Sequence, residues 1–233
     1  MTDVRFRSDM TVELVDAMAS DASVVRAARV STKGAESRDA QADAGLIRYL
    51  MKNRHGSPFE HAVFTFYVEA PIFVFRELMR HRIASYNEES ARYRELEPVF
   101  YVPAGDRPLV QVGKAGEYRF EPGTRAQHFD TVETLKMTSR AAYNLYQVML
   151  ADGIAREVAR MSLPVSIYSS AYVTINARSL MNLLSLRTKR EGSSFPSYPQ
   201  REIELVAEGF ERHFARLMLA TYAAFDEAGR VAP

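Results

Sequence analysis

The sequence predicts a helix-rich α+β fold, a single domain over residues 1–233 with a small, mostly antiparallel sheet. Several segments carry apolar residues at the three- and four-residue spacing of an amphipathic helix. A few shorter segments are rich in β-branched and aromatic residues, which is typical of strands. The chain has no internal repeat, low-complexity tract or clean linker, so nothing in it indicates a second domain.

The first half of the chain is predicted to contain two strands and three helices. In chain order they are a strand over 11–14, helices over 21–29 and 39–54, a strand over 61–68 and a helix over 71–82. Either Ser20 or Asp21 can cap the first helix. Pro71 suits the first turn of the third helix, which would place Ile72, Phe75 and Met79 inward.

The second half is predicted to be mostly helical. The elements are helices over 129–150, 154–161, 176–187 and 200–227, and a strand over 165–174. The last helix would be the longest, with Ile203, Val206, Phe210, Phe214 and Leu217 at core spacing. Glycine and proline indicate an excursion loop over 103–123, and serine and proline indicate a second loop over 189–199.

Composition excludes several kinds of chemistry. The 233 residues include 30 lysines and arginines against 29 acidic residues, so no broad basic surface for nucleic acid is expected. The chain has no cysteine, which excludes disulfides, thiolate nucleophiles, zinc–thiolate sites and iron–sulfur clusters. It also lacks an apolar run long enough for a membrane span and a secretory signal at its start. We therefore expect a cytoplasmic protein without a membrane partner.

Histidine spacing does not indicate a metal site. The sequence lacks H-E-x-x-H, and His55 with His61 is not a helix-face pair. We interpret His61, His128 and His213 as structural, and we expect no metal.

A dense polar segment over residues 80–94 follows a strongly apolar predicted helix. It holds four arginines, a histidine, two glutamates, two serines, an asparagine and two tyrosines. If its later part is extended, Glu88, Ser90 and Arg92 project to one side. Guanidinium groups bind phosphate through paired hydrogen bonds, and hydroxyls can occupy the remaining oxygens. The segment therefore favours a phosphate site over its alternative, a solvated helix end followed by a charged loop.

The spacing within this segment resembles a family signature. Arg80-His81-Arg82, followed after seven residues by Ser90, is similar to the R-H-R-x₇-S pattern of flavin-dependent thymidylate synthases. Blocks over residues 55–61, 155–164 and 176–187 resemble other parts of that family, in the same order. The resemblance extends over roughly residues 20–225.

The resemblance implies reductive methylation of dUMP to dTMP. Methylenetetrahydrofolate would donate the carbon, FAD would carry the hydride and NADPH would supply the electrons. The absence of cysteine agrees, because the unrelated class of thymidylate synthase needs a cysteine nucleophile. Neither G-x-G-x-x-G nor G-x-x-x-x-G-K-[ST] occurs, so arginines, backbone amides and helix ends would have to hold the FAD diphosphate.

The resemblance also implies the site residues. For FAD they are His55, Ser57, Arg80, His81, Arg82, Glu88, Asn176, Ala177, Arg178 and Asn182. For dUMP they are Glu77, Leu78, Met79, Arg80, Glu88, Glu89, Ser90, Ala91, Arg92, Arg160 and Arg187, partly through backbone atoms. Arg92 and Arg160 suit the phosphate, and Ser90 can donate to it.

Arg187 is the candidate catalytic residue. A guanidinium at the pyrimidine edge would favour ionisation at N3 and so activate the ring. Its alternative role is interaction with the C-terminus of its own helix. Ser90 is a weaker nucleophile candidate, because no base is placed to activate it.

Other assignments have structural alternatives. Asn176 can be a helix cap, and Asn182 can be a surface amide. Glu77 stands where some relatives have glutamine, so its part in nucleotide binding is open. The 189–200 stretch, longer than the turn we associate with the family, can alter the edge of the site or be a surface loop.

The family resemblance also implies a homotetramer with sites shared between subunits. Large aromatic side chains at 143, 146, 210, 214, 222 and 225 offer apolar surface for assembly, although core packing explains them as well. Three other functions compete with this interpretation: a nucleotide- or RNA-binding module, a different flavoprotein oxidoreductase and an inactive helical protein.

Overall fold

The computed structural model describes residues 3–31, 40–114 and 118–233, and the chain divides into two units. The smaller unit comprises Met1–Asp9, Ala70–Phe73 and Glu89–Ser169, and the larger unit comprises Met10–Glu69, Val74–Glu88 and Ser170–Pro233. Eight α-helices and eight strands occur in the described residues, which confirms the helix-rich α+β class. A single domain over residues 1–233 stays a prediction. None of the described helices is long and apolar enough to cross a membrane.

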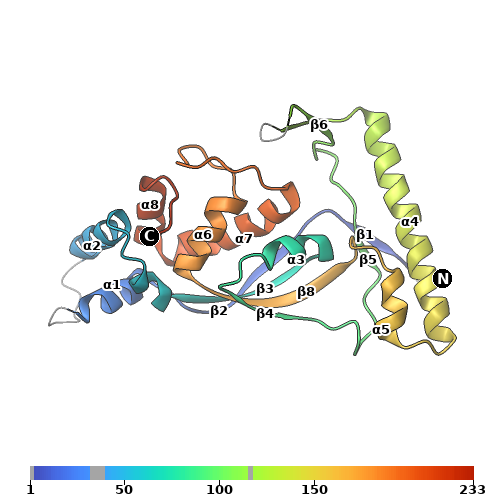
Figure 1. Cartoon of the computed structure of the whole chain (residues 1–233), viewed down its shortest axis with the longest axis horizontal. Helices are drawn as coiled ribbons and strands as arrows, with labels where there is room; N and C mark the ends of the chain where they lie inside the picture. Colours follow the sequence, from blue (N-terminus) through green and yellow to red (C-terminus); the bar gives the residue numbers. More distant parts are fainter. Residues whose placement is uncertain (1–2, 32–39, 115–117) are drawn as a thin grey trace. The chain divides into compact units, whose positions relative to one another are not determined.

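A four-stranded sheet with the order β2-β3-β8-β4 forms the centre of the larger unit (Figure 1). Its strands are β2 (Thr11–Met18), β3 (Val63–Pro71), β8 (Tyr168–Asn176) and β4 (Ser85–Glu88). The β2–β3 and β4–β8 pairs are antiparallel, as predicted for most of the sheet. Phe64, Phe66 and Val68 alternate along β3 and are fully buried, so one face of this strand supports the core.

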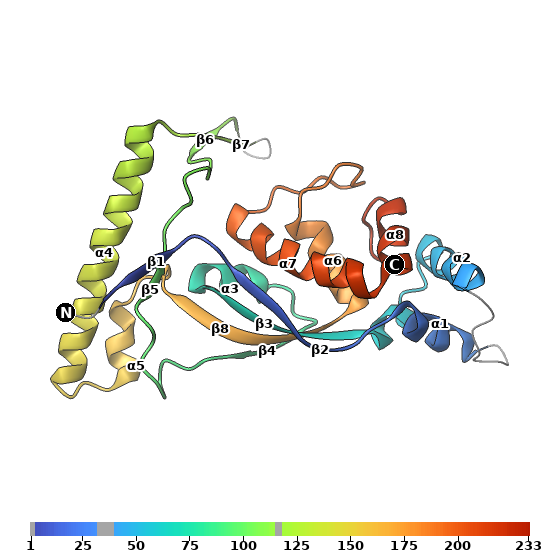
Figure 2. The same ribbon diagram turned by 180° about the vertical axis from the view of Figure 1, so that it is seen from behind.

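Helix α7 (Arg201–Leu217) packs closely on this sheet, beside α6 (Ala177–Arg187) (Figures 1 and 2). A Cβ atom at Gly209 would lie 2.6 Å from the Cβ of Val12 in β2, so the close approach of helix and strand requires glycine there. On the same helix, the Phe210 ring lies 4.5 Å from the Phe66 ring. The apolar residues predicted for this helix thus form the face that packs on the sheet.

The N-terminal helices of the larger unit pack against α8 (Leu219–Glu227). Ser20 caps α1 (Asp21–Arg29), accepting from the Ser23 amide at 3.1 Å. Asp21 instead accepts from the Ala220 and Thr221 amides at the start of α8, both at 2.9 Å. Helix α2 spans Ala40–Lys52, and residue 39, its predicted first residue, lies outside the described residues. The choice between two caps is resolved because each residue caps a different helix.

Two predicted helices in the larger unit were too long. The helix predicted over 200–227 is divided at Met218, whose φ of −132° and ψ of 62° are not helical. Helix α3 (Ile72–Leu78) ends before residue 82, because the Tyr86 hydroxyl donates to the Leu78 and His81 carbonyl oxygens and the backbone turns. In both cases a side chain from outside the helix satisfies backbone groups at the break: Asp21, about 200 residues away, or Tyr86, which follows shortly after α3.

The smaller unit is built around α4 (Arg125–Ala151), followed by α5 (Arg156–Ala159) and the 3₁₀ turn η2 (Arg160–Ser162). Strand β1 (Arg5–Arg7), which we did not predict, pairs in parallel with β5 (Val99–Tyr101). The core of the smaller unit contains Phe100, Tyr143, Tyr146 and Ile167. A three-residue strand has too short a pattern to be seen in the sequence.

The loop predicted over 103–123 contains two short strands. Strand β6 (Val110–Val112) pairs antiparallel with β7 (Arg119–Glu121), so the excursion contains a pair of short strands that we did not predict. Residues 115–117 within this loop lie outside the described residues. The second loop, over 189–199, is free of helix and strand as predicted.

Candidate functional site

Arg187, the candidate catalytic residue, is held on two sides at the end of α6. Its Nη1 donates to Glu77 Oε2 at 2.7 Å, and its Nε donates to His81 Nε2 at 3.2 Å. The exposed fractions of the Arg187 and Glu77 side chains are 15% and 26%. Glu77 lies on α3 and His81 follows that helix, whereas Arg187 ends α6. The larger unit therefore brings together two motifs that are distant in the sequence. The structure therefore fixes the orientation of this guanidinium.

Burial determines the protonation state of this cluster. It lowers the pKa of His81 to about 4, and the positive charge of Arg187 contributes. His81 is therefore neutral near pH 7, and its Nε2 can accept the Arg187 hydrogen bond. Burial also raises the pKa of Glu77, and Glu202 adds to this effect while Arg187 opposes it. Arg187 thus lies between a neutral imidazole and a half-buried carboxyl group.

Tyr86, which sequence reasoning did not select, supports this cluster from β4. Its hydroxyl lies 2.8 Å from the Leu78 carbonyl oxygen and 3.0 Å from the His81 carbonyl oxygen. Burial raises the pKa of Tyr86 to about 12, so the hydroxyl keeps its proton. The aromatic residue inside an otherwise polar motif was the available signal, since a buried tyrosine usually bonds a backbone group.

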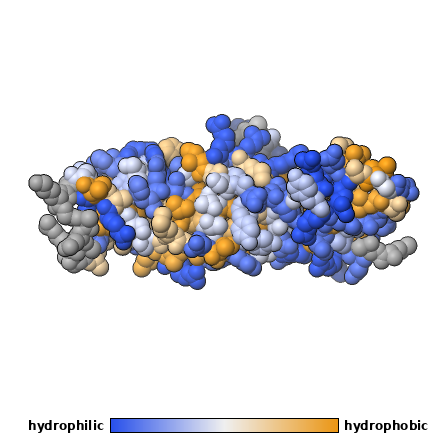
Figure 3. Space-filling model, turned by 90° about the horizontal axis from the view of Figure 1, so that it is seen from below, coloured by the Kyte–Doolittle hydropathy of each residue, from blue (hydrophilic) through white to orange (hydrophobic). Residues whose placement is uncertain are grey.

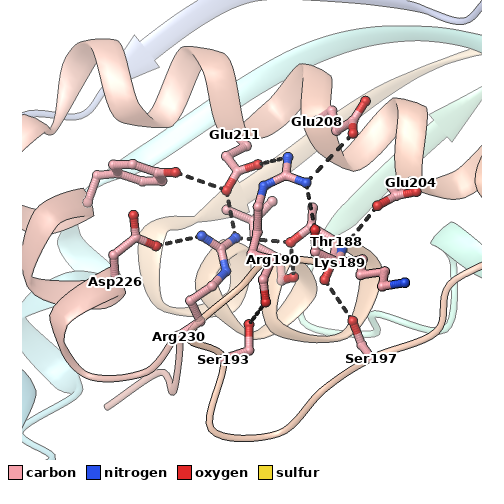
Figure 4. A network of polar contacts seen from close by, with 12 residues as sticks. Thr188, Lys189, Arg190, Ser193, Ser197, Glu204, Glu208, Glu211, Asp226 and Arg230 are labelled. Carbon is pink, nitrogen blue, oxygen red and sulfur yellow. Dashed lines mark hydrogen bonds and ion pairs between the residues drawn. The ribbon is translucent and has the colours of Figure 1, made fainter.

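A network of buried charges fixes the chain directly after Arg187 (Figure 4). Arg230 Nη2 donates to Glu211 Oε1 at 2.6 Å and to Thr188 Oγ1 at 3.0 Å. The Arg230 and Glu211 side chains have exposed fractions of only 3% and 7%. Arg190 Nη2 donates to the other Glu211 oxygen at 2.6 Å. Because Thr188 follows Arg187, this network restrains the end of α6.

The 189–200 loop is attached to the same network. The Ser197 hydroxyl donates to the Thr188 carbonyl oxygen at 2.7 Å, and the Lys189 amide donates to Glu204 Oε1 at 3.0 Å. These contacts tie the loop to the end of α6, while most of its residues are exposed, so whether it alters the edge of the site stays a prediction.

Arg178, a predicted FAD residue, is anchored beside a required glycine. Its Nε donates to the Pro233 carbonyl oxygen at 2.7 Å, and its Nη1 donates to Glu60 Oε1 at 2.6 Å. A Cβ atom at Gly56 would lie 2.4 Å from Arg178 Nε, so a larger residue would displace the guanidinium. Sequence reasoning missed Glu60, although it lies in the same 55–61 block as His55 and Ser57.

The two asparagines of α6 match their structural alternatives. Asn176 caps the helix, because its Oδ1 accepts from the Ser179 amide at 2.9 Å. Asn182 is exposed, and its Nδ2 donates to the Arg178 carbonyl oxygen at 3.2 Å, as the four-residue spacing predicts. Their contact with a flavin stays a prediction.

Predicted FAD residues line two cavities of the larger unit. A cavity of about 390 Å³ is lined by Arg82 and Asn176, together with Glu60 and Ser85. Another, of about 290 Å³, is lined by His55 and Ser57.

His61, which we interpreted as structural, also lines the second of these cavities. Arg80 and Arg82 are exposed, and neither forms an ion pair within the described residues. Free guanidinium groups and amides are the donors that a dinucleotide diphosphate needs. The residues therefore fit an FAD-type ligand.

The predicted phosphate-binding row lies in a turn, and not on one strand. Strand β4 ends at Glu88, and the Ser90 carbonyl oxygen accepts from the Tyr93 amide at 3.0 Å. The Ser90 hydroxyl accepts from the Arg92 amide at 3.3 Å, a local bond that favours turns over strands. The segment is thus extended only as far as Glu88, so the condition under which Glu88, Ser90 and Arg92 would project to one side is not met.

Arg92 and Arg160 nevertheless remain open to a ligand. Arg92 Nε pairs with Glu157 Oε2 at 2.9 Å, and both side chains are about half exposed, at 54% and 53%. Arg160 is exposed in η2. Ala91 is buried in the core of the smaller unit and anchors the turn.

The two units divide the predicted site residues. The larger unit holds all ten predicted FAD residues and, for dUMP, Glu77, Leu78, Met79, Arg80, Glu88 and Arg187. The smaller unit holds Glu89, Ser90, Ala91, Arg92 and Arg160. Leu78 and Ala177 are fully buried, backbone atoms included, so their contact with a nucleotide stays a prediction. Within the described residues, no group of three or more histidine and acidic side chains could hold a metal.

Comparison with known proteins identifies the family of this chain. The sequence profile of a family described as "Thymidylate synthase complementing protein" matches residues 13–218. A "Flavin-dependent thymidylate synthase" of Streptomyces avermitilis is 58% identical over 98% of this chain and 95% of its own length. Another of that name, from Tropheryma whipplei, is 59% identical over 98% of this chain and 97% of its own length.

A solved structure agrees over the whole fold. The UMP/dUMP methylase PolB from Streptomyces cacaoi, bound with 5-Br dUMP, superposes with a TM-score of 0.94 and 55% sequence identity. The superposition covers 99% of this chain and 100% of the other. The family profile covers most of the chain and the curated relatives share more than half of its residues, so this chain belongs to the family of flavin-dependent thymidylate synthases.

Proposed function

We propose that this protein converts dUMP to dTMP by reductive methylation. FAD carries the hydride, methylenetetrahydrofolate donates the carbon and NADPH supplies the electrons. The observation that carries the proposal is the restrained Arg187 guanidinium between Glu77 and His81. Family membership supports the same reaction.

Arg187 acts on the pyrimidine ring. A fixed cation at the ring edge stabilises the negative charge that develops on the ring, and it does so better than mobile water. Because Arg187 is already oriented by two partners, it needs little reorganisation when the substrate binds. Glu77 and neutral His81 hold the guanidinium in place. Arg187 can exchange either of these two hydrogen bonds for one to the ring.

No enzyme nucleophile is needed. The chain has no cysteine, and the Ser90 hydroxyl accepts from a backbone amide, which cannot activate it as a base would. FAD would supply the hydride chemistry when bound, and Arg80, Arg82 and Arg178 would hold its diphosphate with the amides of Asn176 and Asn182. Arg92, Arg160 and Ser90 bind the dUMP phosphate, since a dianion can replace Glu157 at an exposed guanidinium.

We also propose a homotetramer in the cytoplasm. The aromatic residues named in the sequence argument do not support assembly, since Tyr143, Tyr146, Phe210, Phe214 and Phe225 are buried in the cores. Other side chains do support it: Phe129, Met137 and Leu145 are exposed on α4. Hydrophobic side chains also gather in patches among hydrophilic ones on the face shown in Figure 3. Light scattering of the purified protein tests the tetramer, and a monomer at micromolar concentration would contradict it.

The absorbance spectrum of the purified protein tests the main proposal. We expect the bands of oxidised flavin, their bleaching by NADPH, and dTMP formation when dUMP and methylenetetrahydrofolate are added. UMP should be assayed beside dUMP, because the structural relative is named for both nucleotides. A colourless protein that ignores added FAD and leaves both nucleotides unchanged would refute the proposal.

A further inference from the structure

A cavity between α2 and α8 contains no residue that the resemblance assigns to FAD or dUMP. Its volume is about 490 Å³, the size of a nucleotide site, and it lies within the larger unit. Met51, Ala224, Ala228 and Val231 supply an apolar part of its lining. Three cations, Arg48, Lys52 and Arg54, and one carboxylate, Glu227, supply its charges.

The described residues of the protein neutralise only one of these three cations. Arg48 Nε pairs with Glu227 Oε2 at 3.1 Å, and both side chains are exposed. Lys52 and Arg54 have no ion pair or side-chain hydrogen bond within the described part of the chain. Three positive groups and one negative group leave two positive charges in excess, which matches the charge of a dianion. A phosphate monoester is such a dianion near neutral pH, and arginine and lysine are its usual partners.

Arg54 occupies a backbone position that favours glycine. Its φ is 59°, in the left-handed region. It ends α2, where the Arg54 amide donates to the Met51 carbonyl oxygen and the His55 amide donates to the Leu50 carbonyl oxygen. This hydrogen-bond pattern at a helix end usually has glycine or asparagine in the left-handed place. An arginine in this strained place, with its side chain lining the cavity, indicates a use for its charge.

The cavity also adjoins a predicted flavin residue. Arg54 and Val231 line a second, smaller cavity of about 190 Å³, which is lined by Asn182 as well. A ligand held by the cations is therefore close to the surface where the resemblance places FAD.

We propose that the α2–α8 cavity binds the phosphate monoester group of a nucleotide, through Arg48, Lys52 and Arg54. Its apolar lining suits the adenosine part of such a ligand. The site follows from the residues alone. Its assignment to the 2′-phosphate of NADPH rests on the proposed function.

Calorimetric titration of the full-length protein with NADP⁺ and NAD⁺ tests the site. The two ligands differ only in the 2′-phosphate, and dUMP is present throughout so that its own phosphate site is filled. Wild type should bind NADP⁺ roughly tenfold or more tightly than NAD⁺, as expected for two charge-assisted contacts. In the double variant Lys52→Gln/Arg54→Gly this preference should disappear, while NAD⁺ affinity stays within about twofold.

Matched variants separate binding from folding. Arg54→Gly should raise Tm by about 2–4 °C, because glycine relieves the left-handed backbone, yet it should weaken NADP⁺ binding. A merely structural arginine would instead lower Tm when removed. Arg54→Lys should keep most of the affinity, and Arg212→Gln, which removes an exposed cation on α7 outside the cavity, should change neither quantity.

A third ligand and a second reductant separate the possible outcomes. If adenosine 2′-monophosphate binds through Lys52 and Arg54 but NADP⁺ shows no preference over NAD⁺, the site takes another phosphate monoester. If neither ligand depends on these two residues, the site is refuted. Dithionite replaces NADPH without using the cavity, so dTMP formation with dithionite tests the proposed function separately. The double variant should keep that activity and lose most of the NADPH-driven activity.

Discussion

Arg187 and Arg230 of the larger unit and Arg92 and Arg160 of the smaller unit are held in opposite ways. In the larger unit, Arg187 and Arg230 are largely buried, and each bonds two or more fixed partners. In the smaller unit, Arg92 has one exposed glutamate partner, and Arg160 is exposed. A buried cation without a partner would be strongly unfavourable, whereas an exposed one is solvated and gains little from its pair.

This difference in burial suits the two tasks that we propose for these arginines. The larger unit provides a cation whose position is set before any ligand binds, as charge stabilisation in a reaction requires. The smaller unit provides exposed cations, and Arg92 among them can exchange its glutamate partner for a phosphate with little loss of free energy. Variants in the two units should therefore differ in which quantity they change, and by how much.

The largest effect is expected at Arg187. Arg187→Ala should reduce dTMP formation by roughly 10²–10³-fold or more, because it removes the fixed cation. The flavin absorbance and Tm should change little, since the residue lies at a helix end. Arg212→Ala, on the exposed face of α7, is the matched control. Normal turnover in the Arg187 variant would remove this residue from the mechanism.

The next largest effect concerns the buried network. Glu211→Gln should lower the free energy of unfolding by about 3 kcal/mol, because it leaves the Arg230 charge buried with only Asp226 to balance it. Glu157→Gln, in the exposed pair of the smaller unit, should change the free energy of unfolding by less than about 0.5 kcal/mol. Urea unfolding of both variants measures the contrast. Equal effects would mean that the two units do not differ as described.

Arg92→Ala should weaken dUMP binding by roughly 10- to 100-fold, which corresponds to one charge-assisted phosphate contact. Turnover at saturating dUMP should stay close to wild type, because this residue binds and does not activate the ring. Titration with dUMP gives the first quantity and steady-state kinetics the second. Unchanged dUMP affinity would refute the phosphate role.

The neutral state of His81 predicts a pH effect on stability. The unfolded imidazole takes up a proton near its ordinary pKa of 6.5, whereas the folded one stays neutral down to about 4. Stability should therefore fall as the pH decreases from 6.5 to 4. This residue contributes roughly 1–2 kcal/mol after its partial exposure is allowed for. Unfolding curves of wild type and His81→Asn at several pH values isolate it, and identical pH profiles would contradict the burial argument.

Ser90→Ala should have the smallest effect. It removes one donor to the phosphate and the local bond from the Arg92 amide, so we expect less than about a tenfold loss in dUMP affinity and substantial residual activity. Complete loss of turnover with dUMP binding intact would instead indicate a nucleophilic serine.

Periodic segments were predictable, and their ends were not. The apolar spacing of α7 and the β-branched run of β3 are local properties, so they were visible in the sequence. The division of the last helix at Met218 depends on Asp21, which is about 200 residues away along the chain. The turn at Ser90 was missed because the same residues can form a strand or a turn, and a serine–amide bond decides between them.

The candidate site shows the same division. Residue types and spacings identified the arginine-rich motif and excluded thiol chemistry, and the family resemblance of the sequence marked Arg187 as the candidate catalytic residue. Only the tertiary structure decided that Arg187 lies between Glu77 and a neutral His81, and that Arg54 borders a cationic cavity. Contacts, burial and the pKa values that follow from them depend on residues far apart in the chain, and these are brought together only when the chain folds.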